Sequence, residues 1–468
     1  MRRLQAMLPQ PFWAIIKPFD HWLDLRHSIN EREFRRIYEG AGVLIFGSGF
    51  KFLLGIVAYG MTARALGVSQ FGVFALIQAY VILMDRIFNF NTRQALVKYG
   101  AQAVQSKNRA EFQALFYSLF ILDISTAIVA TSIAIGVVYA FADNIGWSHE
   151  FLPSIVLYST IILFNTSAPG GVLRLFNRFG ALTWIAIASS TIKVAAVFVA
   201  YQLETGLWTF LLAWAIGDIV ERILLIGLGF HEMRRRGFSE VFSSGLRGVM
   251  HSHKGIQTFL LSSNLESALR LLSYEVDIFI VGYFLDLYAV GVYKIIKEVV
   301  LVIIGTGDTI HQSSYPLMAR LSANQEYGKI RRYLGDMRRI GLICSATILV
   351  SYYFFGRPVL KTIFGAKDAV FFLPLFIAMF GPLLWMSQSG YASAMYTLGF
   401  ATQLLMISFV GGVISVLCHL IFTPRYGLEG AAISFLSSFI VWTICTYVLV
   451  NKGLRLQVLH TTEKPIQV

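Results

Sequence analysis

Long apolar runs dominate this sequence, and they recur from about residue 41 to residue 450. Each run has roughly the length of a helix that crosses a bilayer, about 20 residues. The runs predict helices, because backbone groups in hydrocarbon must be satisfied within the segment and the alternating pattern of a membrane β-barrel is absent. We therefore expect an all-α polytopic membrane protein with about 12 transmembrane helices, at 41–65, 70–97, 112–141, 151–172, 179–202, 206–230, 256–283, 289–316, 336–355, 369–396, 401–422 and 427–450.

The basic residues predict the orientation of these spans. The chain has 39 Lys and Arg and a net charge of +13. If the residues at span ends, Arg64, Arg338 and Arg339, are counted with the adjoining side, 26 basic residues fall on the side that carries both termini, 5 on the opposite side and 8 within spans. HEMRRRG (231–237) and KIRRYLGDMRR (329–339) belong to the first group. Because loops rich in Lys and Arg stay on the cytoplasmic side, we expect both termini in the cytoplasm, and no nucleic-acid partner.

The segments that flank the spans are short and basic. Residues 1–40 include PFWAIIKPFDHWLDLRH (11–27), which mixes aromatic, apolar and basic residues and predicts an amphipathic segment on the inner membrane surface. A disordered tail is the alternative. MRRLQAMLPQ has no apolar core followed by a small-residue cleavage site, so we expect no cleaved signal peptide. Residues 236–255 are expected to form a basic cytoplasmic linker, and 451–468 a cytoplasmic tail.

An internal repeat relates the two halves of the chain. A shift of 219 residues aligns FGVF (71–74) with VGVY (290–293), and a shift of 221 aligns ETGL (204–207) with RYGL (425–428). The same shift places the first six spans over the last six in the same orientation. Such repeats are common in transporters. We expect two parallel six-helix lobes, 41–235 and 256–450, with pseudo-two-fold symmetry around a central cavity.

Charged residues within the spans identify the expected walls of this cavity. Lys51 and Arg270 are related by the 219-residue shift, and each would cost about 2.5–3.5 kcal/mol at mid-bilayer if it faced lipid. We expect them to face each other across water. Helical spacing groups further polar residues into one stripe on each of three spans. These are Gln78, Arg86, Asn89 and Arg93 in span two; Glu266, Arg270 and Asp277 in span seven; and Lys294, Lys297, Asp308 and His311 in span eight.

Some intramembrane charges have simpler explanations. Glu266 and Arg270 are four residues apart, so they can neutralise each other without binding a substrate. Asp85 can pair with a neighbouring helix, and Arg93 can extend to the headgroups. For three further residues we expect structural pairing, namely Lys193, Asp218 and Arg222.

One segment predicts a bend. SAPGGV (167–172) places Pro169, Gly170 and Gly171 inside span four, where proline removes a backbone donor and glycine permits bending. We expect these residues to act as a hinge when the lobes move.

Several stretches of the sequence resemble a known family. Four stretches resemble pieces of the polysaccharide transporters of the multidrug/oligosaccharidyl-lipid/polysaccharide exporter superfamily, and they occur in the same order as in that family. They are RALGVSQFGVFAL (64–76), QALVKYGA (94–101), FIVGYFLDLYAVGVYKI (279–295) and PLMARL (316–321). The chain departs from the family pattern at Asp286, Lys294 and FNT (90–92). The resemblance covers nearly the whole twelve-span region and rests on loose motifs.

This resemblance implies a flippase for undecaprenyl-diphosphate-linked oligosaccharides that works by alternating access in the bacterial inner membrane. A diphosphate needs cationic partners as it crosses hydrocarbon. The residues that would line its path are Lys51, Arg86, Asn89, Arg93, Arg270, Lys294 and Lys297. Coupling to H⁺ or Na⁺ would involve Asp85, Asp123, Glu266, Asp277, Asp308 or His311. Membrane lipids and other polysaccharide-assembly membrane proteins are the expected partners.

Two other functions stay open. A cation-coupled multidrug exporter would share the fold but favours an acidic cavity. A membrane polysaccharide polymerase or ligase commonly needs a large external loop, whereas the external connections here are short. The sequence contains no nucleophile–base pair, metal cluster or phosphate-binding glycine loop, so we expect no catalytic residue, no metal and no cofactor.

Overall fold

The computed structural model describes residues 31–90, 92–145, 149–238, 255–272, 275–365 and 369–462, and nearly all of them are helical. Most of the expected amphipathic segment and of the basic linker lies outside the described residues. In chain order the elements are α3 (Glu31–Phe88), α4 (Thr92–Gln105), α5 (Arg109–Ile145), η2 (His149–Phe151), α6 (Leu152–Ser159), η3 (Thr160–Phe164), α7 (Ala168–Leu175), α8 (Phe179–Gln202), α9 (Leu207–Arg235), α11 (Ile256–Leu272), α12 (Val276–Phe284), α13 (Leu287–Ala323), α14 (Tyr327–Phe364), η4 (Ala369–Phe371), α15 (Phe372–Ser387), α16 (Ser389–Thr397) and α17 (Ala401–Thr462).

The expectation of an all-α polytopic membrane fold is confirmed. Five helices in the described part of the chain are long and apolar enough to cross a membrane, or seven if each bent pair forms one span. Helix α3 has 58 residues and α17 has 62, and a straight helix of that length would measure about 90 Å. Each instead reverses at a glycine with positive φ, Gly67 (φ 71°) and Gly427 (φ 59°), a conformation that glycine adopts without strain. The total of 12 spans stays a prediction.

Two spans are broken rather than continuous. Leu152–Phe164 and Ala168–Leu175 meet at 41°, at the expected bend, and Phe372–Ser387 and Ser389–Thr397 meet at 45°. The second break, at Gln388, was not expected. It lies 221 residues after Ser167, so both halves carry the break at repeat-related positions. Span seven is also divided, into α11 and α12.

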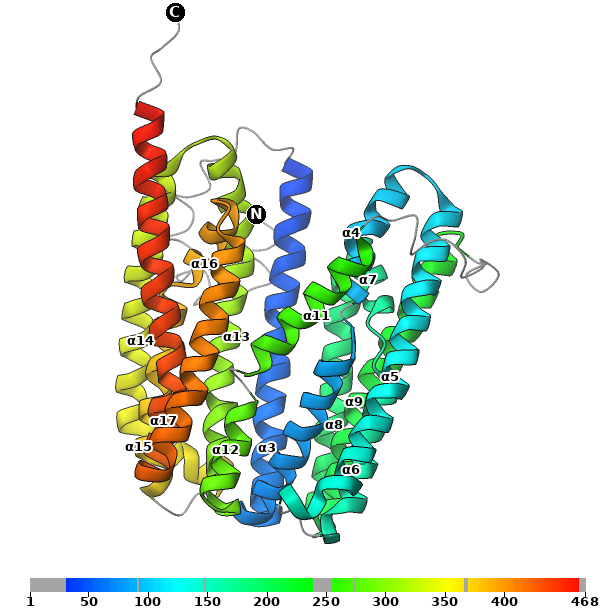
Figure 1. Ribbon diagram of the computed structural model, residues 1–468, viewed down its shortest axis with the longest axis vertical. Coiled ribbons are helices and arrows are strands. Elements are labelled where there is room, and N and C mark those ends of the chain that lie inside the picture. Colours follow the sequence, from blue (N-terminus) through cyan, green and yellow to red (C-terminus); the bar gives the residue numbers. More distant parts are fainter. Residues whose placement is uncertain are drawn as a thin grey trace, which may run out of the picture.

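The elements form two groups side by side (Figure 1). Helices α4 to α9 form one group and α12 to α17 the other, with the first arm of α3 between them and α11 crossing from one group to the other. Helix α3 packs against both α8 and α13, and α11 contacts α3, α4 and α17. The start of α11 therefore contacts the first half of the chain, although we assigned 256–450 to the second lobe. The boundary between the lobes stays a prediction.

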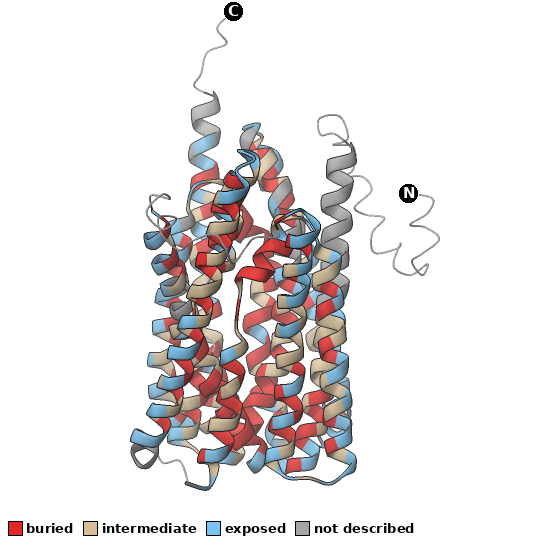
Figure 2. Ribbon diagram, turned by 90° about the vertical axis from the view of Figure 1, so that its right-hand side faces the viewer, coloured by how far each residue is buried: buried red, intermediate tan, exposed pale blue. Residues whose placement is uncertain are grey.

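The packing of apolar side chains joins the two groups at one end only. A shared core, which contains residues from α3, α6, α9, α12, α13, α15 and α17, lies toward the end where Gly67 and Gly427 reverse the chain. Toward the other end there are two separate cores. One comprises residues of α4, α5, α7, α9 and α11, and the other residues of α13, α14, α16 and α17. Buried residues accordingly fill the interior of the bundle (Figure 2). The two groups are thus closely packed at one end and independently packed at the end that we predict to be cytoplasmic.

Two glycines bring the halves together at the joined end. A Cβ atom on Gly72 would lie 1.9 Å from the carbonyl oxygen of Leu287, and a Cβ on Gly291 would lie 2.1 Å from that of Val68. Gly72 and Gly291 are 219 residues apart, and so are Val68 and Leu287. The contacts are therefore reciprocal, as a two-fold axis requires. Hydrogen takes the place of a side chain because the backbones approach too closely for a methyl group.

Candidate functional site

The cation Lys51 is paired within its own half. Its Nζ atom lies 2.9 Å and 3.0 Å from the two carboxylate oxygens of Glu221 on α9, and both side chains are partly exposed. We expected Lys51 to face Arg270, whose side chain, like that of Glu266, lies outside the described residues. The repeat offset relates equivalent positions in two halves but carries no information about partners within one half, which is why Glu221 was missed.

The polar stripe expected on span two does not continue through the span. Helix α3 ends at Phe88 and α4 begins at Thr92, so helical spacing does not connect Arg86 with Arg93. Asn89 is buried and donates to the Asn165 carbonyl at 3.1 Å and to Asp85 at 3.2 Å, whereas Arg86 is exposed. Sequence spacing assumed one continuous helix, and the interruption turns these side chains in different directions.

Asp85 binds polar groups at the break in span four. Its carboxylate accepts two hydrogen bonds from the Asn165 side chain, at 2.7 Å and 2.8 Å, and lies 3.6 Å from the Arg222 guanidinium. Arg222 also donates to the carbonyl of Ile161, just before the break. These groups satisfy backbone and side-chain polar atoms where the helix is interrupted. The expected structural pairing is confirmed for Arg222, and also for Lys193 with Asp218.

Asp123 holds the start of α7. It is fully buried and accepts from the backbone N–H groups of Ser167 and Ala168, both at 2.8 Å, and from the Thr92 hydroxyl at 2.7 Å. A carboxylate at a helix N-terminus is favoured by the free N–H groups and by the helix dipole. Asp123 thus anchors α7 from α5. A role in ion coupling stays a prediction.

The expected hinge residues belong to the first turn of α7. Pro169 occupies a position where a helix tolerates proline, and the chain bends just before it. A Cβ on Gly170 would lie 3.2 Å from the side chain of Leu225, and a Cβ on Gly171 would lie 3.1 Å from the Arg93 carbonyl. Both glycines therefore allow close packing. Whether they also permit movement stays a prediction.

Three arginines form a cluster of positive charge beside this break. Arg86 and Arg174 both lie within electrostatic range of Arg93, and none of the three forms an ion pair with a described residue. Arg86 and Arg174 occupy the last turns of α3 and α7, where the helix dipoles favour a cation. Arg93 occupies the first turn of α4, where the dipole disfavours it. We call these three residues the arginine cluster.

The expected cations of span eight are buried and paired. Lys297 lies 2.7 Å from Asp277, and Lys294 lies 2.8 Å from Glu298 on the same helix, with Tyr59 of the first half 5.3 Å away. Both lysines are about 5% exposed or less, so they do not line an open path in this conformation. The reason is the shared core, which closes around the start of α13.

Asp277 belongs to a network that the sequence did not reveal. The Tyr293 hydroxyl donates to Asp277 at 2.8 Å and lies 3.2 Å from Nε2 of His419, which is fully buried in α17. His419 lies more than a hundred residues further along the chain, so no local motif could connect it with Asp277. Further along α13, Asp308 is exposed and His311 lies 2.8 Å from the Ser393 hydroxyl of α16.

Arg174 was not among the expected site residues. RLFNRFG (174–180) marks it only as part of a basic connection. The distinguishing feature is spatial, because α7 places it beside Arg93 of α4.

Comparison with known proteins supplies a family. The model of a family described as "Polysaccharide biosynthesis protein" matches residues 37–322. The "Inner membrane protein YghQ" of Escherichia coli (strain K12) is 24% identical over 351 residues, which are 74% of this chain and 97% of that protein. The "Probable low-salt glycan biosynthesis flippase Agl15" of Haloferax volcanii is 22% identical over 417 residues, which are 86% of this chain and 79% of that protein.

Solved structures share the fold at low sequence identity. The "Inward-facing conformation of a multidrug resistance MATE family transporter of the MOP superfamily" superposes with a TM-score of 0.70 at 14% identity, covering 91% of this chain and 100% of that chain. The "Lipid II flippase MurJ, inward closed conformation" superposes with a TM-score of 0.67 at 13% identity, covering 89% and 90%. At these identities the comparisons show the fold alone.

Proposed function

This chain belongs to the polysaccharide biosynthesis protein family, and from that premise we propose that it is a flippase for undecaprenyl-diphosphate-linked oligosaccharides. It would move the lipid-linked glycan across a bacterial inner membrane by alternating access of its two halves. Relatives named as an inner membrane protein and as a glycan biosynthesis flippase support both the location and the activity.

The arginine cluster carries this proposal. A diphosphate has about two negative charges, and guanidinium groups bind phosphate oxygens through paired, charge-assisted hydrogen bonds. Arg86, Arg93 and Arg174 are free of ion pairs with described residues and come from three different helices. A cation at membrane depth is costly unless an anion or water neutralises it. Arg93 is half-buried and Arg86 and Arg174 are exposed, so an anion can reach all three. A diphosphate supplies that anion.

The arrangement of the cores suggests a direction of entry. The two halves pack separately at the basic end and together at the opposite end. A headgroup would enter from the basic end, while the polyprenyl chain stays in lipid. Phe52 of α3 packs against Gly305 of α13 and closes a lateral opening between these two helices, so in this conformation the tail requires another route.

Coupling to an ion is a further part of the proposal. Among the carboxylates expected to take up H⁺ or Na⁺, Asp277 is the best situated, because Tyr293 and Lys297 contact it and His419 lies next to Tyr293. A proton that entered this network would weaken the Asp277–Lys297 pair at the joined end. We expect Asp277→Asn to change the pH dependence of transport, and an unchanged profile would remove Asp277 from the coupling mechanism.

A multidrug exporter of organic cations shares the fold but fits the site poorly. The positive arginine cluster would repel such a substrate by simple electrostatics. A polymerase or ligase is disfavoured by the relatives, which are named as a membrane protein and a flippase rather than as enzymes.

The deciding experiment is translocation in proteoliposomes. A fluorescent undecaprenyl-diphosphate oligosaccharide is scored by its accessibility to an external lectin, with an organic cation as the competing substrate. Replacing Arg86, Arg93 and Arg174 by glutamine should slow translocation by about tenfold per residue, the equivalent of one charge-assisted hydrogen bond. Lysine at the same positions should restore part of the rate.

Arg339→Gln is the matched control. This arginine has a side chain that is 83% exposed and forms only a distant pair with Asp336, at 3.9 Å. The substitution removes the same charge as the cluster variants do but leaves the arginine cluster intact, so this variant should transport normally. Transport of the organic cation, without flipping of the glycan lipid by the wild-type protein, would refute the proposed function.

A further inference from the structure

A second basic site lies at the end of the first half, and no residue of the arginine cluster lines it. Three connections meet there: residues 105–109 between α4 and α5, residues 176–178 between α7 and α8, and residues 236–238 after α9. They enclose a pocket of about 490 Å³, within the usual size range of small-ligand sites. The lining residues are Ala103, Val104, Lys107, Asn108, Arg109, Phe112, Phe176, Arg236 and Phe238.

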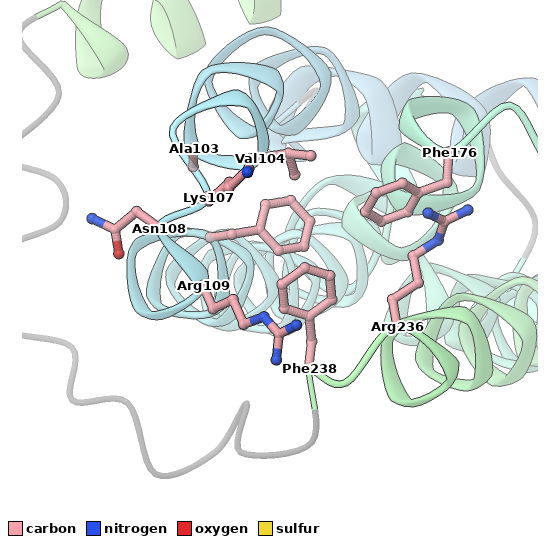
Figure 3. Close-up of a pocket in the computed structure, with 9 residues that line it drawn as sticks. Ala103, Val104, Lys107, Asn108, Arg109, Phe176, Arg236 and Phe238 are labelled. Carbon is pink, nitrogen blue, oxygen red and sulfur yellow. The ribbon is translucent and has the colours of Figure 1, made fainter.

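The pocket combines an aromatic floor with a cationic rim. Phe112 packs against both Phe176 and Phe238, at centroid distances of 5.9 Å and 4.8 Å. The guanidinium of Arg109 lies beside Phe238 and that of Arg236 beside Phe176, whereas Asn108 points away (Figure 3). This is an amphipathic surface, with apolar contacts beneath and positive charge at the edge.

Arg236 is held in place for this geometry. Its guanidinium carbon lies 3.9 Å from the centroid of the Phe176 ring, and its Nε atom lies 2.7 Å from Glu232. Glu232 is buried and also pairs with Arg178, so its charge is already balanced. The ring and the carboxylate therefore fix the position of Arg236, which lines the pocket.

Lys107 and Arg109 contribute charge that no described residue neutralises. Neither forms an ion pair with a described residue. Lys107 adopts a positive φ of 57°, and Gly237 leaves room for the guanidinium of Arg109, which would lie 3.5 Å from a Cβ at that position. The backbone around the pocket is thus arranged to accommodate these cations.

We infer that this pocket binds the phosphate headgroup of an anionic phospholipid in the adjoining leaflet. Basic pockets at the cytoplasmic ends of membrane helices suit such headgroups, because each cation near the surface contributes about 1 kcal/mol and the rings accommodate the glycerol and acyl region. The site lies on the first half alone, so a bound lipid would hold α4, α5, α7 and α9 together. It does not depend on which substrate the protein transports.

The test measures lipid binding to the full-length protein in nanodiscs. Fluorescent phosphatidylglycerol is the probe, phosphatidylcholine is the neutral competitor, and undecaprenyl diphosphate and inorganic phosphate are the two other sources of the same chemistry. The variant Lys107→Gln with Arg109→Gln removes the two lining cations that form no ion pair with a described residue. Lys329→Gln with Arg339→Gln removes two exposed cations from the other half and serves as the control.

The expected result is a phosphatidylglycerol affinity that falls about thirty-fold in the pocket variant and not in the control. Binding should resist phosphatidylcholine and inorganic phosphate. Equal affinity in the two variants would overturn the assignment. Stronger displacement by undecaprenyl diphosphate than by unlabelled phosphatidylglycerol would overturn the phospholipid as ligand and identify the pocket as a substrate site. Thermal unfolding of each variant without added lipid shows whether a loss of binding reflects a loss of folding.

Discussion

Adding one methyl group at the joined end should favour separation of the halves there. In Gly72→Ala the new Cβ would lie 1.9 Å from the Leu287 carbonyl oxygen, and in Gly291→Ala it would lie 2.1 Å from that of Val68. Carbon and oxygen normally approach to about 3.3 Å. The helices must therefore separate by more than 1 Å, roughly, or tilt, because both atoms met by the methyl group are backbone atoms.

The size of the effect follows from overpacking. Extra methyl groups in a tightly packed interface cost about 1–3 kcal/mol. If this cost falls only on the conformation in which the halves are joined, the conformational equilibrium shifts by about 5- to 150-fold. Because the two contacts are related by the repeat, the two single variants should behave alike, and the double variant should shift the equilibrium further.

Electron–electron distance measurements provide the assay. Spin labels at Leu203 and Tyr426, both more than half exposed, report on the two halves at this end, in a background without native cysteines. Both glycine variants should populate longer distances and transport more slowly. Gly136→Ala is the control, because its Cβ would meet no atom within 4 Å. An unchanged distance distribution in the Gly72 and Gly291 variants would refute the idea that this crossing holds the end closed.

Three further predictions concern the first half of the chain. Lys51→Met and Glu221→Gln should each lower the melting temperature more than the double variant does, because only the single variants leave a charge unpaired. We expect a coupling energy of about 1 kcal/mol between the two residues. Additive losses of stability in a double-mutant cycle would contradict the pairing. Asp123→Ala should lower the free energy of unfolding in denaturant by about 3 kcal/mol or more, since two backbone N–H groups and a hydroxyl lose their acceptor. A stability within roughly 1 kcal/mol of wild type would show that Asp123 is not the anchor of α7. Gly171→Ala should slow transport more than Gly170→Ala does. The methyl group added at Gly171 meets a backbone carbonyl, whereas the one added at Gly170 meets only a flexible leucine side chain. The reverse order of rates would favour bending over packing as the reason for these glycines.

The sequence determined the class of fold and its internal symmetry. Apolar runs of membrane-spanning length leave helices as the stable solution, and the 219-residue offset pointed to Gly72 and Gly291 without showing that they touch. The bend in span four followed from Pro169, since proline restricts where a helix can continue. These features depend on length, composition and local backbone chemistry, which a sequence displays directly.

Only the tertiary structure decided which charges are neutralised. Lys51 pairs with Glu221 on α9 and Lys297 pairs with Asp277, whereas Arg93 pairs with no anion in the described part of the chain and lies near two other arginines. All of these residues looked alike in the sequence, as ionisable groups within apolar runs. An ion pair needs two groups within about 4 Å, and helices distant in sequence supply the second one, so pairing is a property of packing rather than of pattern. For the same reason the sequence placed Arg86 and Arg93 among many candidate cations, and only the fold brought Arg174 near them.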